Sequence, residues 1–331
     1  MASHIGRRKL LATLGGAAVA WPLAARAQQT AMPVVAFLRD GSADASARYV
    51  AAFRKGLSEI GVVEGQNATV EYHWLEGRYD RLPALMADLV RRQVAVMATL
   101  GNLPTLAAKA ATATIPIVFG VGDDPIKLGL VASFARPGGN ATGINFFNQE
   151  VASKRLRLLH ELVPNAVHVA VLVNPVNASA TETLLRIMKE AAPTIGLQIQ
   201  ILNATTIGEI DAAFATIERE RPDALFVTGD AFFVSRAVQF ATLTARSRIP
   251  ATYSLRDYVA VGGLMSYGTD FTEAFRQVGV YTGKILNGAK PVDLPVVQST
   301  KFEFVINVQT ARALGLEVPA QLLAIVDEVI E

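Results

Sequence analysis

Residues 264–307 read LMSYGTDFTEAFRQVGVYTGKILNGAKPVDLPVVQSTKFEFVIN, and the overall architecture can be argued from them. An apolar strand at 264–267 is followed by one helix at 271–287, a second strand at 301–306 and a helical turn at 310–314. One extra helix and one strand are too little for a further domain of this kind. We therefore expect the tail to return to two lobes already formed, so that several segments cross between them and make a hinge.

Upstream of this tail, short runs rich in Val, Ile and Phe alternate with longer segments of helical period. This alternation is typical of parallel strands covered by helices on both faces, so the fold class is α/β. The pattern occurs twice, separated by the glycine-rich run 138–143, which we interpret as a turn and interlobe crossing. The first group predicts strands at 34–38, 69–74, 94–100 and 117–121, with helices at 46–60, 79–92 and 104–113. The second predicts strands at 167–173, 198–203, 224–228 and 251–254, with helices at 150–162, 179–195, 207–220 and 232–246.

The N-terminal residues have the three parts of a secretory signal. Arg7-Arg8 precedes an uncharged stretch at 10–25, and the A-x-A triplet 25–27 follows. The apolar run is shorter than the ~20 residues of a membrane-spanning helix. We expect a twin-arginine signal peptide over residues 1–27, cleavage after Ala27 and a periplasmic location.

Composition excludes several classes of function. Without the signal, 27 Lys and Arg face 29 Asp and Glu, a formal net charge of −2, which argues against nucleic acid as a partner. The sequence contains no cysteine, and its four histidines lack metal-ligand spacing, so no metal or cofactor is expected. No G-x-S-x-G elbow or other catalytic motif is present.

Ligands of open parallel sheets bind beyond the carboxyl ends of the strands, where helix N-termini also converge. We expect the ligand contacts among these strand-end residues: Asp40, Ser42, Asn102, Thr105, Asp123, Asn174, Asp230, Phe232, Tyr253, Arg256 and Tyr267. Several have a plainer explanation, because Asp, Ser and Asn cap helices and a tyrosine can belong to the core. Arg256 suits a ligand carboxylate, but an ion pair with Asp257 or Asp270 explains it equally well.

Longer motifs resemble those of the ABC transporter substrate-binding family, in the branch whose better-known members take up tryptophan, tyrosine or phenylalanine. They are GDDPIKLGLVAS at 122–133, RPGGNATG at 136–143, MSYG at 265–268, KFEFVIN at 301–307 and ALGL at 313–316. The resemblance covers nearly all of the chain after the signal. It implies a type I periplasmic-binding-protein fold: two Rossmann-like lobes joined by three interlobe crossings. The lobes implied are 30–143 plus 268–296, and 144–267 plus 297–331.

The resemblance also implies a function: binding a small organic solute, such as an amino acid, aromatic ones included, or an organic acid. The solute would pass to a membrane permease driven by a separate ATPase. Asp123 or Asp230 would hold an ammonium group, and Ser42, Thr105 and the backbone of Asn102 a carboxylate. We expect a monomer. An exported α/β enzyme acting on a small carboxylate through Asp123 and Asp230 is the alternative, and a sensory or regulatory protein of the same fold is a third, less favoured reading.

Overall fold

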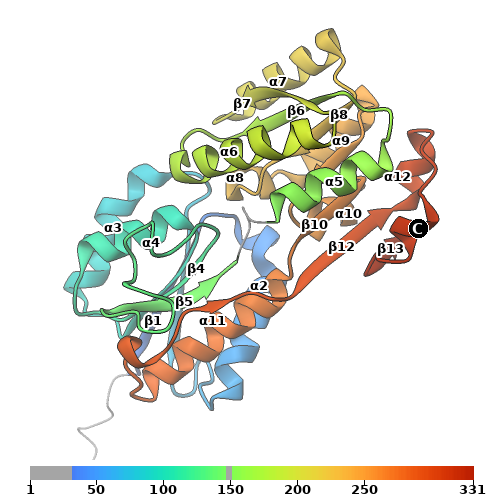
Figure 1. Ribbon diagram of the computed structural model, residues 1–331. Helices are drawn as coiled ribbons and strands as arrows, with labels where there is room; N and C mark the ends of the chain where they lie inside the picture. The colour runs from blue at the N-terminus through green and yellow to red at the C-terminus, as the bar shows by residue number, and fades with distance from the viewer. Residues whose placement is uncertain (1–31, 147–150) are drawn as a thin grey trace, which may run out of the picture.

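The computed structural model describes residues 32–146 and 151–331, which form two α/β lobes (Figure 1). The predicted signal lies outside the described residues. The first lobe contains β1 (Val34–Arg39), α2 (Ala43–Glu59), β2 (Thr69–Trp74), η1 (Tyr79–Arg81), α3 (Leu82–Arg91), β3 (Val96–Leu100), α4 (Asn102–Ala111), β4 (Ile117–Val121) and β5 (Ala141–Asn145). The second contains α5 (Ala152–Leu162), β6 (His168–Val173), α6 (Ala178–Thr194), β7 (Gln198–Asn203), α7 (Ile207–Glu220), β8 (Ala224–Val227), α8 (Ala231–Val234), α9 (Ala237–Ser247), β9 (Ala251–Tyr253), α10 (Arg256–Ala260) and β10 (Met265–Thr269).

The tail returns to both lobes, as expected from its composition of strand, helix and strand. It consists of α11 (Phe271–Leu286), η2 (Pro291–Asp293), β11 (Val297–Gln298), β12 (Phe302–Asn307), α12 (Val308–Ala313), α13 (Ala320–Leu323) and β13 (Glu328–Ile330). Strand β11 joins the first sheet, whereas β12 and β13 join the second. The chain therefore passes between the sheets three times: after β5, after β10 and between β11 and β12.

The first sheet has the strand order β11-β5-β4-β3-β1-β2, and its neighbours are all parallel. Every residue of β3, β4 and β5 is buried, as expected for strands that helices cover on both faces. Parallel pairing brings the carboxyl ends of these strands to one edge of the sheet. That edge faces the second lobe.

The second sheet has the order β13-β12-β10-β9-β8-β6-β7. The expectation of parallel sheets is wrong here for one pair, because β12 runs antiparallel to β10, with Thr269 opposite Phe302. The reason is the position of both strands at the hinge. Strand β10 leaves the second lobe at the point where β12 enters it, so the two neighbours run in opposite directions.

The run 138–143 is not the interlobe crossing expected from the sequence, since residues 141–145 form the inner strand β5. A side chain at Gly143 would place its Cβ 2.0 Å from the carbonyl oxygen of Phe119 on β4. The glycine thus permits a close approach of two strands and does not mark a turn. The chain leaves one sheet for the other after Asn145, Thr269 and Gln298.

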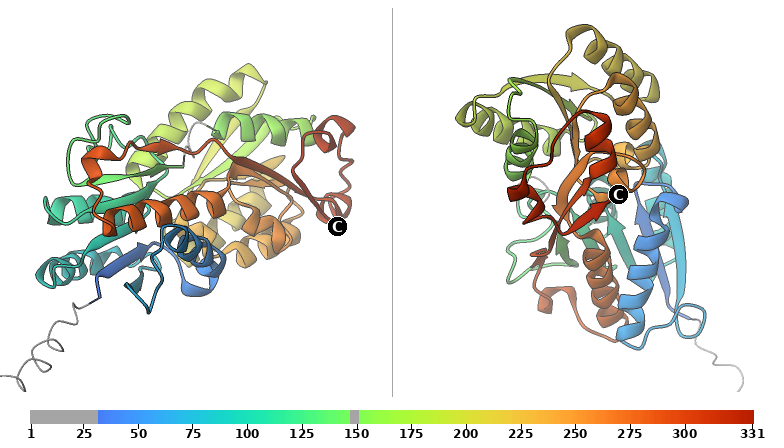
Figure 2. Two further views of the ribbon diagram at one scale, coloured as in Figure 1. Left: turned by 90° about the horizontal axis from the view of Figure 1, so that it is seen from below. Right: turned by 90° about the vertical axis from the view of Figure 1, so that its right-hand side faces the viewer.

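Helix α11 from the tail completes the first lobe by packing along α2 (Figures 1 and 2). Glycines allow the two helices to touch backbone to backbone: a Cβ at Gly56 would lie 1.9 Å from the carbonyl oxygen of Arg276. A Cβ at Gly279 would lie 2.1 Å from that of Phe53. The helix pair covers one face of the first sheet, and its Phe275 reaches the core beside Phe37. This packing fixes α11 next to the edge of the sheet that faces the other lobe.

The second lobe differs from the sequence prediction at its shorter elements. The helix expected over 232–246 is divided into α8 and α9, and neither α10 nor β13 was predicted. Each of these pieces has three to five residues, apart from α9, and is too short for a periodic pattern. Within residues 32–146 and 151–331, no helix has the length and apolar character needed to cross a membrane.

Candidate functional site

A cavity of about 90 Å³, which opens to solvent, lies between the two lobes at the carboxyl ends of the strands. Its first-lobe lining follows β1, β3, β4 and β5 and comprises Arg39, Asp40, Tyr79, Leu100, Gly101, Asn102, Leu103, Pro104, Gly122, Asp123 and Phe146, with Phe271 and Phe275 from α11. Its second-lobe lining comprises Asn177, Ala180, Gly229, Asp230, Ala231, Val234, Ser254 and Leu255. Small-molecule sites occur preferentially at such interfaces between α/β domains.

Arg39, the last residue of β1, brings a buried positive charge to the cavity. Its guanidinium carbon lies 4.5 Å from the ring centroid of Tyr49 and 4.9 Å from that of Phe275. Nη1 is buried and has no hydrogen-bond partner among the described residues. Burial lowers the pKa of this guanidinium. A buried donor without a partner lowers the stability of the folded protein, so the guanidinium of Arg39 is suited to donate hydrogen bonds to an anionic group of a ligand.

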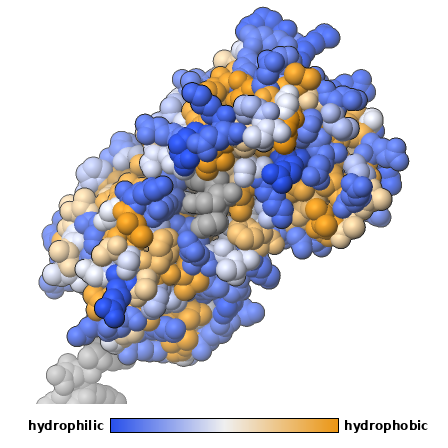
Figure 3. Space-filling model, in the orientation of Figure 1, coloured by the Kyte–Doolittle hydropathy of each residue, from blue (hydrophilic) through white to orange (hydrophobic). Residues whose placement is uncertain are grey.

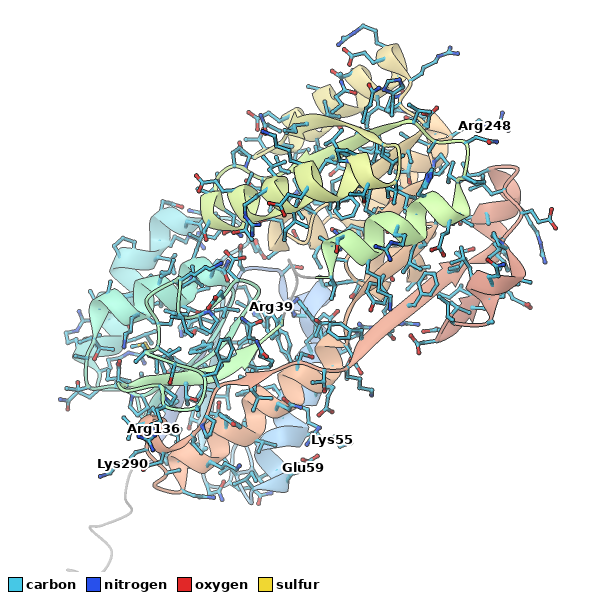
Figure 4. All side chains as sticks on the ribbon, viewed as in Figure 1. Arg39, Lys55, Glu59, Arg136, Arg248 and Lys290 are labelled. Atoms are coloured by element: carbon cyan, nitrogen blue, oxygen red, sulfur yellow. The ribbon has the colours of Figure 1, made fainter. Side chains whose placement is uncertain are left out.

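In Figure 4, Arg39 lies at the side of the first lobe that faces the second lobe. Lys55, Glu59, Arg136 and Lys290 lie toward the opposite end of the first lobe in the same view. Arg39 is not among the residues expected from the sequence to contact ligand. The sequence contains one indication of its role: Arg39 is a charged residue at the end of an otherwise apolar strand, and it directly precedes the candidate Asp40.

Two carboxylates face each other across the cavity. Asp40 accepts hydrogen bonds from the hydroxyl of Tyr79 and, at 3.1 Å, from the backbone N–H of Gly77. Burial raises the pKa of Asp40 to about 6, and the charge of Asp230 in the other lobe adds to the rise. Two carboxylates that repel each other in a desolvated site would be stabilised by a cationic group between them.

Asp230 is the N-cap of α8, and its Oδ1 accepts from the backbone N–H of Phe232 at 2.9 Å. The same oxygen accepts from Nδ2 of Asn174 at 3.0 Å. Burial raises the pKa of this carboxyl group despite these hydrogen bonds. The structure therefore places the predicted Asp230 in the cavity, and the predicted Asn174 beside it as a support.

Asn102 and Asp123 also line the cavity, as the sequence predicts for residues that follow β3 and β4. Asn102 is the first residue of α4, and its Oδ1 accepts from the N–H of Gly122 at 3.2 Å. The carbonyl of Asp123 accepts from Nδ2 of Asn145 at 2.8 Å. These bonds hold the loops after β3, β4 and β5 together on the first-lobe side.

The structure does not bring Ser42 or Thr105 to the cavity. Ser42 caps α2, accepting from the N–H of Ala45 at 3.4 Å. Thr105 is fully buried within α4 and donates to the carbonyl of Gly101 at 2.6 Å. Both hydroxyls therefore form hydrogen bonds with the backbone and do not reach the cavity, where they were expected to bind a ligand carboxylate.

Three aromatic candidates lie in the cores of the second lobe instead of lining the cavity. Phe232 and Tyr253 belong to one core cluster, where Tyr253 stacks on Tyr258 with ring centroids 4.3 Å apart. Tyr267 belongs to the cluster on the other face of the sheet, near Phe304. For Tyr253 on β9 and Tyr267 on β10, alternation along the strand determines this placement, because the side chains point into the helix layers. Phe232 belongs to the short helix α8, which packs its ring into the core.

Arg256 is also outside the cavity. Its Nε lies 3.0 Å from Oε2 of Glu328 and 3.6 Å from Oε1 of Glu303. It is thus an ion-paired arginine, although its partners are not the Asp257 or Asp270 expected from the sequence. Glu328 belongs to β13, a strand that the sequence did not predict.

The remaining first-lobe wall is aromatic. The ring centroids of Phe146 and Phe271 are 4.7 Å apart, and those of Phe271 and Phe275 are 5.9 Å apart. Leu100 and Leu255 extend this apolar surface from the two lobes. The cavity therefore combines a charged region with an apolar region, which suits a solute that has both charged groups and an apolar part. No group of three or more His, Asp or Glu side chains suited to a metal ion occurs among the described residues.

Two α/β lobes, three crossings and a polar and aromatic cavity between the lobes define a type I periplasmic binding protein. The model of the family "ABC transporter substrate binding protein" matches residues 33–330, and the chain belongs to this family. Membership makes the protein a binding protein of the ABC type and not an enzyme.

Known relatives agree with this assignment. A tyrosine-binding protein of Clostridioides difficile is 24% identical over 267 residues, which are 80% of this chain and 76% of the relative. A Streptococcus pneumonia ABC domain in complex with L-Trp is 24% identical with a TM-score of 0.83, covering 91% of this chain and 100% of that one. A conserved domain protein of Vibrio cholerae is 25% identical with a TM-score of 0.83, covering 90% and 100%.

Proposed function

We propose that this protein is the periplasmic component of an ABC importer and that its solute is an amino acid with an aromatic or similarly bulky apolar side chain. It would act as a monomer that delivers the solute to a permease driven by a separate ATPase. The family supports the transport role, and the signal predicted at residues 1–27 supports the location.

The observation that carries the choice of solute is a buried, unpartnered guanidinium nitrogen in the same cavity as two opposed carboxylates. In our proposal Nη1 of Arg39 binds the α-carboxylate, replacing the role expected for Ser42 and Thr105. Asp40 and Asp230 bind the ammonium group from opposite lobes, so that the charge of the ligand relieves their repulsion. Asp123 and Asn102 line the same cavity.

The aromatic wall supports an apolar side chain on the solute. Phe146, Phe271 and Phe275 present adjoining rings, and stacking or edge contacts with a ligand ring would stabilise the complex. The relative from Clostridioides difficile is named for tyrosine and the solved Streptococcus domain holds L-Trp. These names agree with the chemistry of this wall.

The test compares L-phenylalanine with phenethylamine, which lacks the carboxylate, and with 3-phenylpropionate, which lacks the ammonium group. Calorimetric titration of ligand-free protein should give tight binding only for the amino acid, since each analogue leaves one buried charged group without a partner. A thermal-shift screen of the other amino acids would then rank the side chains, because a bound solute stabilises the folded state. Equal binding of 3-phenylpropionate would contradict the amino-acid assignment and favour an organic acid.

A further inference from the structure

A hydrogen bond joins the two lobes beside the cavity, close to Phe271, which follows the chain crossing after β10. The hydroxyl of Tyr49, in α2 of the first lobe, donates to Oδ2 of Asp257, in α10 of the second. Nη2 of Arg48 lies 3.0 Å from the Tyr49 hydroxyl and 3.4 Å from the same carboxylate oxygen. Tyr49 is fully buried, whereas the side chains of Arg48 and Asp257 are partly exposed, so the contact is only partly shielded from water.

The same tyrosine holds the proposed carboxylate-binding residue. Its ring lies 4.5 Å from the guanidinium carbon of Arg39, and Phe275 lies 4.9 Å from that carbon. The rings of Tyr49 and Phe275 are themselves 5.0 Å apart. Arg39 therefore rests against two aromatic rings, and one of these rings ends in the hydroxyl that contacts the other lobe.

We propose that Tyr49 and Asp257 are positioning residues for ligand capture: the Tyr49 ring orients Arg39, and the Tyr49–Asp257 hydrogen bond holds the lobes closed around a ligand bound there. The inference rests on the proposed role of Arg39 in binding the solute. Neither Tyr49 nor Asp257 lines the cavity, so both act through other groups and not by touching the solute.

The two functions of Tyr49 separate because they use different atoms. The ring contacts Arg39 inside the first lobe, and this contact is kept when the lobes part. The hydroxyl bonds across the lobes, and this bond breaks when Asp257 moves away with α10. A closed complex that loses the hydroxyl should therefore open and release its solute sooner, whereas capture by the open form should change little.

The decisive variant is Tyr49→Phe, which keeps the ring and removes the interlobe hydrogen bond together with the hydrogen bond that the hydroxyl accepts from Arg48. The dissociation rate of the solute that binds best, measured by stopped-flow or surface plasmon resonance, should rise about tenfold, while the association rate stays within about threefold. Tyr72→Phe is the matched control, because the Tyr72 hydroxyl also bonds a carboxylate, that of Glu64 at 3.0 Å, but within the first lobe. It should leave both rates unchanged.

A second comparison separates the ring from the hydroxyl. Tyr49→Leu should lower affinity further than Tyr49→Phe, because Arg39 then loses a supporting ring. Asp257→Ala should raise the dissociation rate at least as much as Tyr49→Phe, because it also removes the ion pair with Arg48. The double variant should be no worse than Asp257→Ala alone, since both changes remove the Tyr49–Asp257 bond. Unfolding midpoints of the ligand-free variants would show that the proteins are folded.

An unchanged dissociation rate in Tyr49→Phe, a change matched by Tyr72→Phe, or additive effects of Tyr49→Phe and Asp257→Ala would each overturn the inference. Those results would leave the proposed function standing, provided that Arg39→Gln still weakens binding. If Arg39→Gln leaves affinity unchanged, the proposed role of Arg39 is wrong, and the positioning role that depends on it fails as well.

Discussion

The two walls of the cavity differ in chemistry. The first lobe contributes Arg39 and Asp40, together with the rings of Phe146, Phe271 and Phe275, whereas the second contributes Asp230 among small residues such as Gly229 and Ala231. Two of the three rings come from α11, so the returning tail builds part of the first wall. If the solute binds as we propose, the first lobe supplies most of the charged and aromatic contacts and the second lobe supplies Asp230.

Supporting contacts hold the charged groups of both walls, since Asp230 on the second wall accepts from Phe232 and Asn174. On the first wall, Arg39 rests on rings and Asp40 accepts from Tyr79 and Gly77. Groups held in this way lose little further freedom when a ligand binds. Elsewhere, the surface drawn in Figure 3 shows hydrophobic residues scattered among hydrophilic ones on both lobes, so this view shows no feature as distinctive as the cavity.

The largest expected effect is that of removing the charge from the first wall. Arg39→Leu should lower affinity for the solute at least about a hundredfold, because a ligand carboxylate would be buried without its partner. Isothermal titration calorimetry measures this loss directly. Arg39→Lys should recover only part of the affinity, since an ammonium group lacks the planar fork that stacks on Tyr49 and Phe275. Near-normal affinity of Arg39→Leu would show that the charge on the first wall does not determine solute binding.

A smaller effect is expected from the second wall. Asp230→Asn should weaken binding about tenfold, because one of the two carboxylates that face the ammonium group is neutralised. It should also raise the melting temperature of the ligand-free protein, since burial disfavours the charged form of Asp230 and its charge repels that of Asp40. Scanning calorimetry and titration together test both directions. If Asp230→Asn lowers the melting temperature and leaves affinity unchanged, the proposed role of Asp230 in binding the ammonium group is wrong.

The regular parts of both lobes were predictable from the sequence. Residues 69–74, 198–203 and 207–220 have the predicted bounds, because burial on both faces gives apolar strands and one-sided burial gives periodic helices. The sequence predictions that failed concern elements whose structure depends on contacts between distant segments. Gly143 resembles a turn residue but permits β5 to approach β4, and β13 exists only where β12 already supplies a partner.

The site was predictable as a set of loops but not as a set of side chains. Asp40, Asn102, Asp123 and Asp230 were found because strand ends converge on one edge of each sheet. Tyr253 and Arg256 were misleading, since the direction of a side chain at a strand end depends on register and on neighbours absent from the local sequence. Arg39 was not predicted to contact the ligand because it ends a buried strand, and the local sequence does not show the aromatic rings that hold its side chain in place.

A change of pH acts on the carboxyl groups of both walls, since burial raises the pKa of Asp40 and of Asp230. Since the pKa of Asp40 is raised to about 6 from its usual 3.8, the folded ligand-free protein binds more protons than the unfolded chain between those values. The contribution of Asp40 to stability is therefore largest at low pH and is lost as pH rises through about 6. Binding of an ammonium group needs the charged carboxylate, so affinity should fall as pH drops below 6.

This pH dependence can be assigned to one residue by Asp40→Asn. The variant should bind more weakly at pH 7.5, and its affinity should change less between pH 7.5 and pH 5 than that of the unaltered protein. Asp230 also faces this position from the other lobe, so Asp230→Asn should lower the midpoint of the transition without removing it. An affinity profile in Asp40→Asn that still falls below pH 6 would place the titrating group elsewhere.

The smallest effect separates two arginines that look alike in the sequence. Arg256 forms ion pairs with Glu328 and Glu303 on the outer strands of the second sheet. Arg39, by contrast, has a guanidinium nitrogen without a hydrogen-bond partner among the described residues, and it lines the cavity. Arg256→Ala should leave solute affinity unchanged and lower the free energy of unfolding by at most about 1 kcal/mol, because the pair is partly exposed. Urea denaturation with calorimetric titration measures both quantities. A tenfold loss of affinity in Arg256→Ala would show that the second lobe holds the anionic end of the solute, and the contrast between the two walls would then be reversed.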